Sequence, residues 1–168
     1  MSIELDTKRL KLRQWRASDI DAYAQICADL EVMKYLTGKA FSRMESWRHM
    51  AFLTGHWQLL GFGHWAVEEK ATGCLIGRVG FLQPDGWPGF EIGWTLGRNY
   101  WGKGYATEAA RKVMDYGFNT LNKTHIISII HPDNHNSKQV AARLGESYER
   151  RENLNGFNLE IWGISKEV

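Results

Sequence analysis

The spacing of hydrophobic positions changes several times along the chain, and each spacing predicts a different element. Apolar and charged side chains alternate over residues 9–15, which is typical of a strand with one buried face. Two stretches of helical spacing follow. The second covers residues 42–60 and begins at a capping serine, Ser42; the first is predicted to be capped by Ser18 and has these apolar positions: Ala22, Ile26, Leu30 and Met33.

The spacing of apolar positions then returns to the two-residue period that is typical of strands. Residues 64–69 and 75–82 predict a hairpin with its turn at residues 72–73. The loop over residues 84–89 contains two prolines and two glycines, and a third strand is predicted over residues 90–96. These three strands form an antiparallel meander.

The last third of the chain alternates again between the two periods. A long amphipathic helix is predicted over residues 105–121, and residues 125–130 are nearly all apolar, as in a strand covered on both faces. A short helix over residues 137–144 precedes a closing hairpin, whose Asn-Gly turn joins two strands: 146–153 and 159–165. The order βααβββαβαββ predicts a mixed α+β fold, with residues 1–168 forming a single domain.

Composition narrows the classes of function. The chain has 168 residues with 21 Lys+Arg against 19 Asp+Glu, so no strong field favours nucleic acid or an anionic membrane as a partner. Hydrophobic residues make up 43% of the chain, enough for one core. Two cysteines, no visible signal peptide and no long apolar run favour a cytoplasmic protein without structural disulfides.

The most informative segment is the glycine-rich turn between the third meander strand and the long helix. Glycines at 97, 102 and 104 allow the backbone to approach a bulky group closely, and the helix start behind them presents free N–H groups. This arrangement predicts an anion site, most simply for a pyrophosphate. The alternative is that the glycines only turn the chain. A P-loop is a weaker alternative, because Gly104 stands where a Mg²⁺-binding hydroxyl is required.

The segment Tyr-Trp-Gly-Lys-Gly-Tyr-Ala-Thr-Glu-Ala, residues 100–109, resembles the acyl-CoA pyrophosphate loop of the GNAT N-acetyltransferases, in the branch that includes the RimJ/RimL type. Trp101 departs from the Arg or Gln usual at the first position of that motif. Asn134-x-x-Ser137 followed by Leu144-Gly145 is similar to the second cofactor motif of the family. The resemblance covers nearly the whole chain. It implies a central twisted, mostly antiparallel sheet that is splayed at the cofactor-binding strands.

The resemblance implies acetyl-CoA as co-substrate and assigns residues to it. Thr95 and Leu96 occupy the strand that binds the pantetheine arm, and Asn134 would bind pantetheine or order its own motif. The pyrophosphate would lie on the loop and first helical turn: Trp101, Gly102, Lys103, Gly104, Tyr105, Ala106 and Thr107. Lys103 would add charge, or else be a mobile exposed side chain, and Asn134 would alternatively be only a turn residue.

The transfer needs a base for the amine and a proton for the departing thiolate. Glu91 occupies a strand position where family members often have a carboxylate, so it is either the base or a structural carboxylate. Family members often use a tyrosine as the acid, but Ala141 stands at that position. Ser137 is therefore the candidate, with a helix cap as the alternative. The other possible bases are His64, His125 and His131. No metal-ligand spacing is present, and Glu146 replaces a common aromatic residue of the family.

The acceptor is an amine that the sequence does not identify. A protein N-terminus, an amino acid, a polyamine, an aminoglycoside-like drug and a nucleotide-sugar amine all remain open. Five residues of the early helices and loops either line its pocket or serve the fold: Glu45, Trp47, Trp57, Asp85 and Trp87. A non-catalytic acyl-CoA sensor is the alternative function, and a homodimer is possible.

Overall fold

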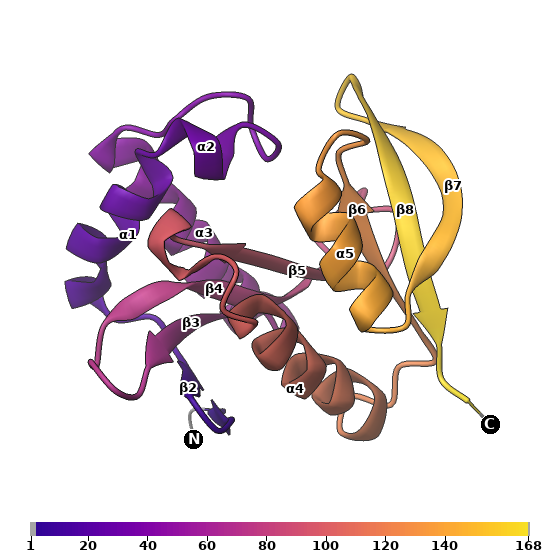
Figure 1. Cartoon of the computed structure of the whole chain (residues 1–168), viewed down its shortest axis with the longest axis horizontal. Helices are drawn as coiled ribbons and strands as arrows, with labels where there is room; N and C mark the ends of the chain where they lie inside the picture. Colours follow the sequence, from indigo (N-terminus) through magenta and orange to yellow (C-terminus); the bar gives the residue numbers. More distant parts are fainter. Residues whose placement is uncertain (1–2, 168) are drawn as a thin grey trace.

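The computed structural model describes residues 3–167, which contain one sheet of eight strands in the order β1-β2-β3-β4-β5-β6-β8-β7. The strands are β1 Leu5–Asp6, β2 Leu10–Arg13, β3 His64–Glu69, β4 Leu75–Leu82, β5 Glu91–Leu96, β6 His125–Ile130, β7 Ser147–Leu154 and β8 Phe157–Ser165. The helices are α1 Ile20–Cys27, α2 Leu30–Met33, α3 Arg43–Leu60, α4 Tyr105–Asn119 and α5 His135–Arg143 (Figure 1). The predicted α+β class and mostly antiparallel sheet are confirmed.

The sheet divides between β5 and β6. All other neighbouring strands pair antiparallel, whereas β5 and β6 are parallel and share a single register pair, Glu91 with Ile127. Beyond that pair the two strands diverge, with β5 running toward α2 and β6 lying beside β8 (Figure 1). The splay expected from the family resemblance is therefore present.

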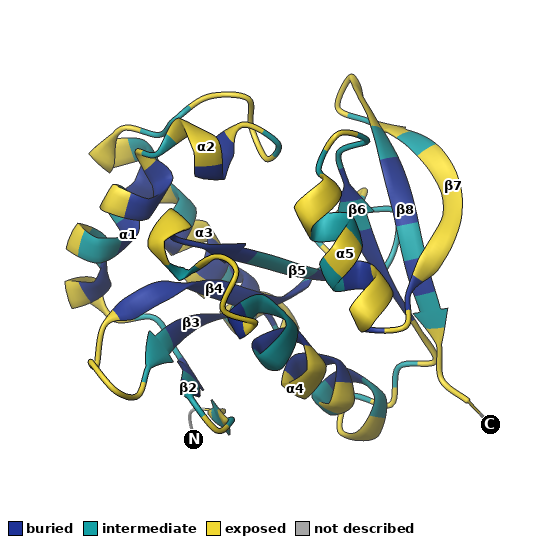
Figure 2. Cartoon of the chain, viewed as in Figure 1, coloured by how far each residue is buried: buried dark blue, intermediate teal, exposed yellow. Residues whose placement is uncertain are grey.

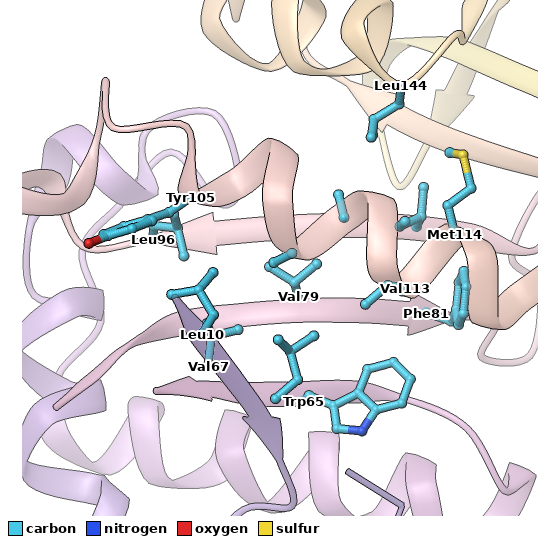
Figure 3. Close-up of a cluster of buried hydrophobic side chains, with 14 of the residues drawn as sticks. Leu10, Trp65, Val67, Val79, Phe81, Leu96, Tyr105, Val113, Met114 and Leu144 are labelled. Carbon is cyan, nitrogen blue, oxygen red and sulfur yellow. The ribbon is translucent and has the colours of Figure 1, made fainter. Parts of the chain in front are cut away.

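Helices cover both faces of the sheet. On one face, α4 packs on β2–β5 through an apolar stripe at helical spacing, and Figure 3 shows Val113 directed toward the strand that carries Val79. On the other face, α1 and α3 enclose a second cluster that includes Tyr23 and Leu53. Strand β3 lies between the two clusters and is buried on both faces, whereas the edge strand β7 is exposed along most of its length (Figure 2).

One glycine allows α4 to lie close to the sheet. A Cβ on Gly117 would come within 2.6 Å of the Phe81 ring and 3.0 Å of Ile126. No side chain fits in that space, so the distance between helix and sheet depends on this glycine. The position of the helix in turn places its N-terminus at the end of β5.

The predicted helix starts are partly confirmed. Ser42 caps α3 in a capping box with Glu45, as expected. The Ser18 cap is wrong, because residues 17–19 form a 3₁₀ turn and the carboxylate of Asp19 accepts from the Arg16 N–H at 2.8 Å. The first predicted helix is divided into α1 and α2, because Asp29 leaves the helical conformation and its side chain caps α2.

Other boundaries differ by a few residues. The sequence pattern missed the short strand β1, and the first predicted strand is reduced to Leu10–Arg13. Helix α5 begins at His135 rather than at Ser137. The closing hairpin is confirmed, and Asn155 and Gly156 both have positive φ, as a type I′ turn requires.

A buried ion pair joins β2 to the turn before α1. Arg13 and Asp19 are each about 5% exposed and are joined by two hydrogen bonds of 2.8 and 2.9 Å. The Nε of the same guanidinium donates to Glu68 of β3 at 2.8 Å. Each charge in this group therefore faces an opposite charge.

Candidate active site

A cleft of about 1130 Å³ lies beyond the point where β5 and β6 separate. Its walls come from α2 and the segment after it, the end of β5, the loop before α4, and the start of α5. Figure 1 shows α2 and α5 on opposite sides of this region. The cleft therefore lies between distant parts of the chain, and its floor is the splayed part of the sheet.

The predicted cofactor residues gather on this cleft. The lining includes, from that prediction, Thr95, Leu96, Trp101, Gly102, Gly104, Tyr105, Ala106, Thr107, Asn134 and Ser137. Lys103 is the exception. It is exposed, and its ammonium group lies 5.6 Å from the centre of the Tyr100 ring.

The loop before α4 exposes the helix N-terminus to the cleft. Gly102 and Gly104 have φ of 71° and 79°, in the left-handed region that other residues rarely adopt. Gly104 occupies the N-cap position, and no side chain caps the first turn. The first backbone N–H groups of α4 and the positive end of its dipole are therefore available to an anion.

Glu108 holds this helix start in place. Its carboxylate accepts from the Thr7 hydroxyl at 2.6 Å, the Arg9 backbone at 2.9 Å and the Arg9 guanidinium at 2.7 Å. Tyr105 lies under the same guanidinium, 4.3 Å from the ring centre, and its hydroxyl donates to Glu69. The sequence did not indicate this role for Glu108, because its partners lie in the turn between β1 and β2, about a hundred residues earlier.

Trp101 has a contact that accounts for its place in the motif. Its indole N–H donates to the Leu96 carbonyl at 2.9 Å, which ties the loop to the end of β5. The side chain is 40% exposed and lines the cleft. On the same strand the Thr95 hydroxyl is buried without a hydrogen-bond partner in the described chain.

The second motif is organised by Asn134. Its side chain caps α5 by accepting from the Ser137 N–H at 3.2 Å. Ser137 is consequently the third residue of the helix, so the alternative that it caps α5 is wrong. Asn134 therefore orders its own motif, which is one of the two roles expected for it. Ser137 lines the cleft.

Two arginines of the cleft wall were missed by the sequence analysis. Arg111 of α4 donates to the backbone carbonyl of Arg143 at 3.1 Å, and both residues line the cleft. They bring positive charge to the cleft that the start of α4 also lines. The sequence could not have indicated that these two arginines are neighbours, because they belong to different helices.

Glu91 lies at the closed end of the splay, where β5 still pairs with β6, and is not among the residues that line the cleft. Its neighbours Phe90 and Ile92 belong to the core on the α4 face, as the alternation predicts. Its carboxylate accepts from the Trp87 indole N–H at 2.6 Å. Burial raises the pKa of Glu91 to about 7, against the opposing effects of Trp87, the Arg78 charge and the Ile129 N–H.

Glu146 lies beside the same point of the sheet. It follows Gly145, whose φ of 90° ends α5 in a Schellman motif, with the Glu146 N–H bonded to the Ala141 carbonyl. Its side chain is buried, and one oxygen lies 3.0 Å from the Ser128 hydroxyl of β6. Burial raises the pKa of Glu146 to about 8, and nearby negative charge on Glu91 adds to the shift.

The alternative bases are occupied elsewhere. His64 is fully buried and accepts from Arg78 at 2.9 Å; burial, and then the Arg78 charge, hold its pKa well below the usual range. His125 pairs with Glu149 at 2.9 Å. The His131 ring lies 5.0 Å from that of Tyr35, centre to centre.

The early tryptophans and acidic residues have separate roles. Trp57 packs on Trp65 and donates to the His64 carbonyl, so it belongs to the core. Trp47 is 57% exposed on α3. Glu45 is committed to the α3 cap and to Lys39, so the structure gives it a structural role. Of the three tryptophans singled out, Trp87 is the one that contacts a candidate catalytic residue.

Within residues 3–167, no three His, Cys, Asp or Glu side chains are grouped as a metal ion would need. In the same residues no helix has both the length and the apolar character to cross a bilayer.

The fold and cleft define a class of protein: an α+β domain with a split sheet and an uncapped helix N-terminus at the split. Residues 9–146 match the model of the GNAT acetyltransferase domain, and the chain belongs to this family. It is an N-acetyltransferase. The family uses acetyl-CoA as acyl donor and amines as acceptors.

Individual relatives agree with this assignment. The uncharacterized N-acetyltransferase p20 of Bacillus licheniformis is 39% identical over 77% of this chain and 74% of its own. An acetyltransferase structure from Agrobacterium tumefaciens is 28% identical, with a TM-score of 0.87 over 98% of this chain and 95% of that one. RimL, a ribosomal L7/L12 α-N-protein acetyltransferase solved with coenzyme A, shares the fold at 18% identity, with a TM-score of 0.80 over 97% and 98% of the two chains.

Proposed function

We propose that residues 1–168 act as one domain that moves acetyl from acetyl-CoA to a primary amine by direct attack in a ternary complex. The observation that carries the proposal is the gathering of the predicted cofactor residues on one cleft, with the free helix start of α4 at its wall. The polar groups that line the cleft suit acetyl-CoA. Free N–H groups, Arg111 and Arg143 favour phosphates, and the unpartnered Thr95 hydroxyl suits the polar pantetheine arm.

The residues of the two motifs bind the donor, and the donor supplies a thioester. The backbone from Gly102 to Thr107 holds the pyrophosphate, and Trp101 keeps that loop on the end of β5. Thr95 and Leu96 bind the pantetheine arm. Asn134 keeps α5 in the position that presents Ser137 to the cleft. Lys103 contributes charge from outside the cleft wall.

The two candidate catalytic residues handle the protons. Glu91 accepts a proton from the ammonium form of the acceptor, directly or through a water, so that the amine nitrogen can attack the acyl carbon. A pKa of about 7 suits a base that must be ionised near neutral pH and still basic enough to take the proton. Ser137 gives a proton or a hydrogen bond to the sulfur when the carbon–sulfur bond breaks.

The acceptor is proposed as an amine of a protein N-terminus or of a small molecule. The RimL structure, whose own acceptor is a protein α-amine, supports the first choice by fold alone. The cytoplasmic location and a homodimer remain predictions from the sequence.

The first experiment is calorimetric titration of the purified chain with acetyl-CoA and, separately, with ATP and Mg²⁺. Micromolar binding of acetyl-CoA and no response to ATP are expected. Gly104→Val is the matched variant, because a β-branched residue at φ 79° distorts the loop, and it should lose affinity by more than tenfold. Normal binding by Gly104→Val would contradict the placement of the pyrophosphate.

The second experiment separates an enzyme from an acyl-CoA sensor. Release of free thiol from acetyl-CoA is followed with a panel of amines that includes N-terminal peptides, amino acids, polyamines and amino sugars. Thiol release with one class of amine identifies the acceptor. Tight binding of acetyl-CoA with no release above the Glu91→Gln background across the panel favours the sensor.

A further inference from the structure

The split of the sheet is surrounded by polar contacts that the catalytic proposal does not use. The Ser128 hydroxyl of β6 lies 3.0 Å from the backbone carbonyl of Ile92 and 3.0 Å from a carboxyl oxygen of Glu146. All three residues are buried, with Ser128 2% exposed, Glu146 4% and Ile92 fully enclosed.

The protons of this group can be assigned by counting donors. A serine hydroxyl carries one hydrogen, and a backbone carbonyl can only accept. If Ser128 donates to Ile92, the contact with Glu146 is a hydrogen bond only when the carboxyl group carries a proton and donates it to the serine oxygen. Both contacts are satisfied together when Glu146 is a neutral acid.

These contacts lie where the hydrogen-bond ladder between β5 and β6 would continue. β6 donates from the Ile127 N–H to the Phe90 carbonyl at 3.0 Å, and the next bond of a parallel ladder would run from the Ile129 N–H to the Ile92 carbonyl. The Ile92 carbonyl instead lies 3.0 Å from the Ser128 hydroxyl. A side chain thus replaces a backbone donor at the point where the strands part.

We propose that Glu146 is a positioning residue of the acyl-CoA cleft: as a neutral acid it donates to Ser128, which is then free to give its own hydrogen to the Ile92 carbonyl, so that this carbonyl bonds a side chain of β6 instead of the Ile129 N–H and the strand ladder stops there. This role rests on the proposed function of the cleft. An ionised Glu146 can only accept a hydrogen bond, so it competes with the Ile92 carbonyl for the single hydrogen of Ser128. The Ile92 carbonyl is then free to pair with the Ile129 N–H of β6. Ionisation therefore closes or distorts the cleft.

The charges that face Glu146 support its neutral form. Glu91 of β5 and Glu149 of β7 are both acidic and disfavour a second negative charge. Within the described residues no cation forms an ion pair with Glu146, whereas Glu149 has His125 and Arg150. The pKa of about 8, raised first by burial, keeps the proton on Glu146 at neutral pH.

The test compares Glu146→Gln, which keeps a donor but cannot ionise, with Glu146→Met, which keeps the volume but cannot donate. Acetyl-CoA affinity is measured by calorimetry at about pH 7 and about pH 9. We expect Glu146→Gln to bind like the wild type at the lower pH and to bind several-fold tighter than the wild type at the higher pH. Glu146→Met should bind roughly tenfold more weakly at both.

Ser128→Ala, which removes the hydrogen bond to Ile92, should resemble Glu146→Met. Glu152→Gln, which removes a carboxylate of β7 that pairs with Arg150, is the control for loss of a negative charge alone, and its affinity should follow the wild type at both pH values. Wild-type affinity in Glu146→Met, or identical pH profiles for wild type and Glu146→Gln, would overturn the proposal.

A second measurement needs no acyl-CoA. Chains labelled with ¹³C at the glutamate carboxyl carbon are titrated by NMR, and the resonance absent from Glu146→Gln identifies the residue. Titration near pH 8 is expected, and titration near 4.5 would overturn the proton assignment. A wild-type chain that binds no acetyl-CoA would refute the proposed function and with it the role in the cleft, whereas normal binding with an indifferent Glu146→Met refutes this inference alone.

Discussion

Two groups of buried charge in this molecule are built in opposite ways. At the base of α1, Arg13 lies against Asp19 and Glu68, and each carboxylate accepts a hydrogen bond from the guanidinium. At the split of the sheet, Glu91 and Glu146 have no ion-pair partner in the described chain. Burial raises their pKa values to about 7 and about 8, and the charge of Glu91 adds to the shift of Glu146.

The difference separates structural charge from functional charge. A paired group serves the fold, whereas an unpaired carboxyl group whose pKa burial raises toward neutrality can gain or lose a proton there. The arrangement also costs stability, because holding an ionised carboxylate without a cation is unfavourable. We expect mutations in the two groups to affect different measurements.

Glu91→Gln should have the largest effect, on turnover. Removing a general base lowers kcat by roughly 10²- to 10⁴-fold, and the deficit should grow between about pH 6 and pH 8 as the wild-type carboxylate ionises through its pKa of about 7. Steady-state rates across that range check it. A pH profile with the same inflection in the variant would exclude Glu91 as the base.

The same variant should be more stable than the wild type at about pH 8. The folded-state pKa of Glu91 lies above its ordinary value of 4.5, so the native state keeps a proton that the unfolded chain releases between about 4.5 and 7. Stability is therefore lost as the pH rises through that window, by up to roughly 3 kcal/mol. Urea unfolding at about pH 5 and pH 8 should show a smaller loss in Glu91→Gln than in the wild type, because only Glu146 still keeps a raised pKa in the variant.

Asp19→Ala should act on stability alone. It leaves the buried Arg13 with Glu68 as its remaining carboxylate, and we expect a loss of roughly 3 kcal/mol. Calorimetry should show unchanged acetyl-CoA affinity for the folded fraction. Asp21→Ala is the control, because its pair with Arg43 is exposed and screened by water, and its unfolding midpoint should stay close to that of the wild type.

Ser137→Ala should lower kcat by roughly tenfold or more while the dissociation constant for acetyl-CoA stays within about twofold. The cap of α5 does not depend on its hydroxyl, because Asn134 binds the backbone N–H of residue 137. Thermal unfolding should therefore be unchanged. Wild-type turnover would leave Ser137 with no part in proton transfer.

Trp87→Phe should give the smallest effect. The indole N–H favours the charged form of Glu91, so its removal should raise the kinetic pKa by about one unit or less. The rate at about pH 9 should match that of the wild type, because the carboxylate is ionised in both. A kinetic pKa below that of the wild type would contradict the hydrogen bond.

The parts of the site that were predicted from the sequence depend on local backbone chemistry. The turn at Gly102 and Gly104 could be inferred because glycine spacing and the following helix pattern are sequence-local. The Ser42 cap and the Asn155 turn follow from the same kind of short-range rule.

The parts that were missed depend on tertiary contacts. Ser18 has the chemistry of a cap, but the neighbouring Asp19 is drawn into the core by Arg13, and the turn forms around it. Glu146 was noted only as a departure from an aromatic residue. The sequence did contain a signal. The residue that follows the glycine at the end of a helix usually packs against that helix, so a carboxyl group at this position must be buried or disrupt the motif.

The single pair between β5 and β6 also bears on how the molecule moves. The strands β6 and β8 with α5 come from one continuous stretch of chain, and within the described residues their single register pair with the N-terminal strands is Glu91 with Ile127. Few backbone bonds resist their separation, so the Ile127 N–H, which bonds the Phe90 carbonyl across the split, should exchange through a local opening rather than through global unfolding. A ligand that fills the cleft contacts both sides at once, and it should slow that exchange more than exchange in β3 or β4.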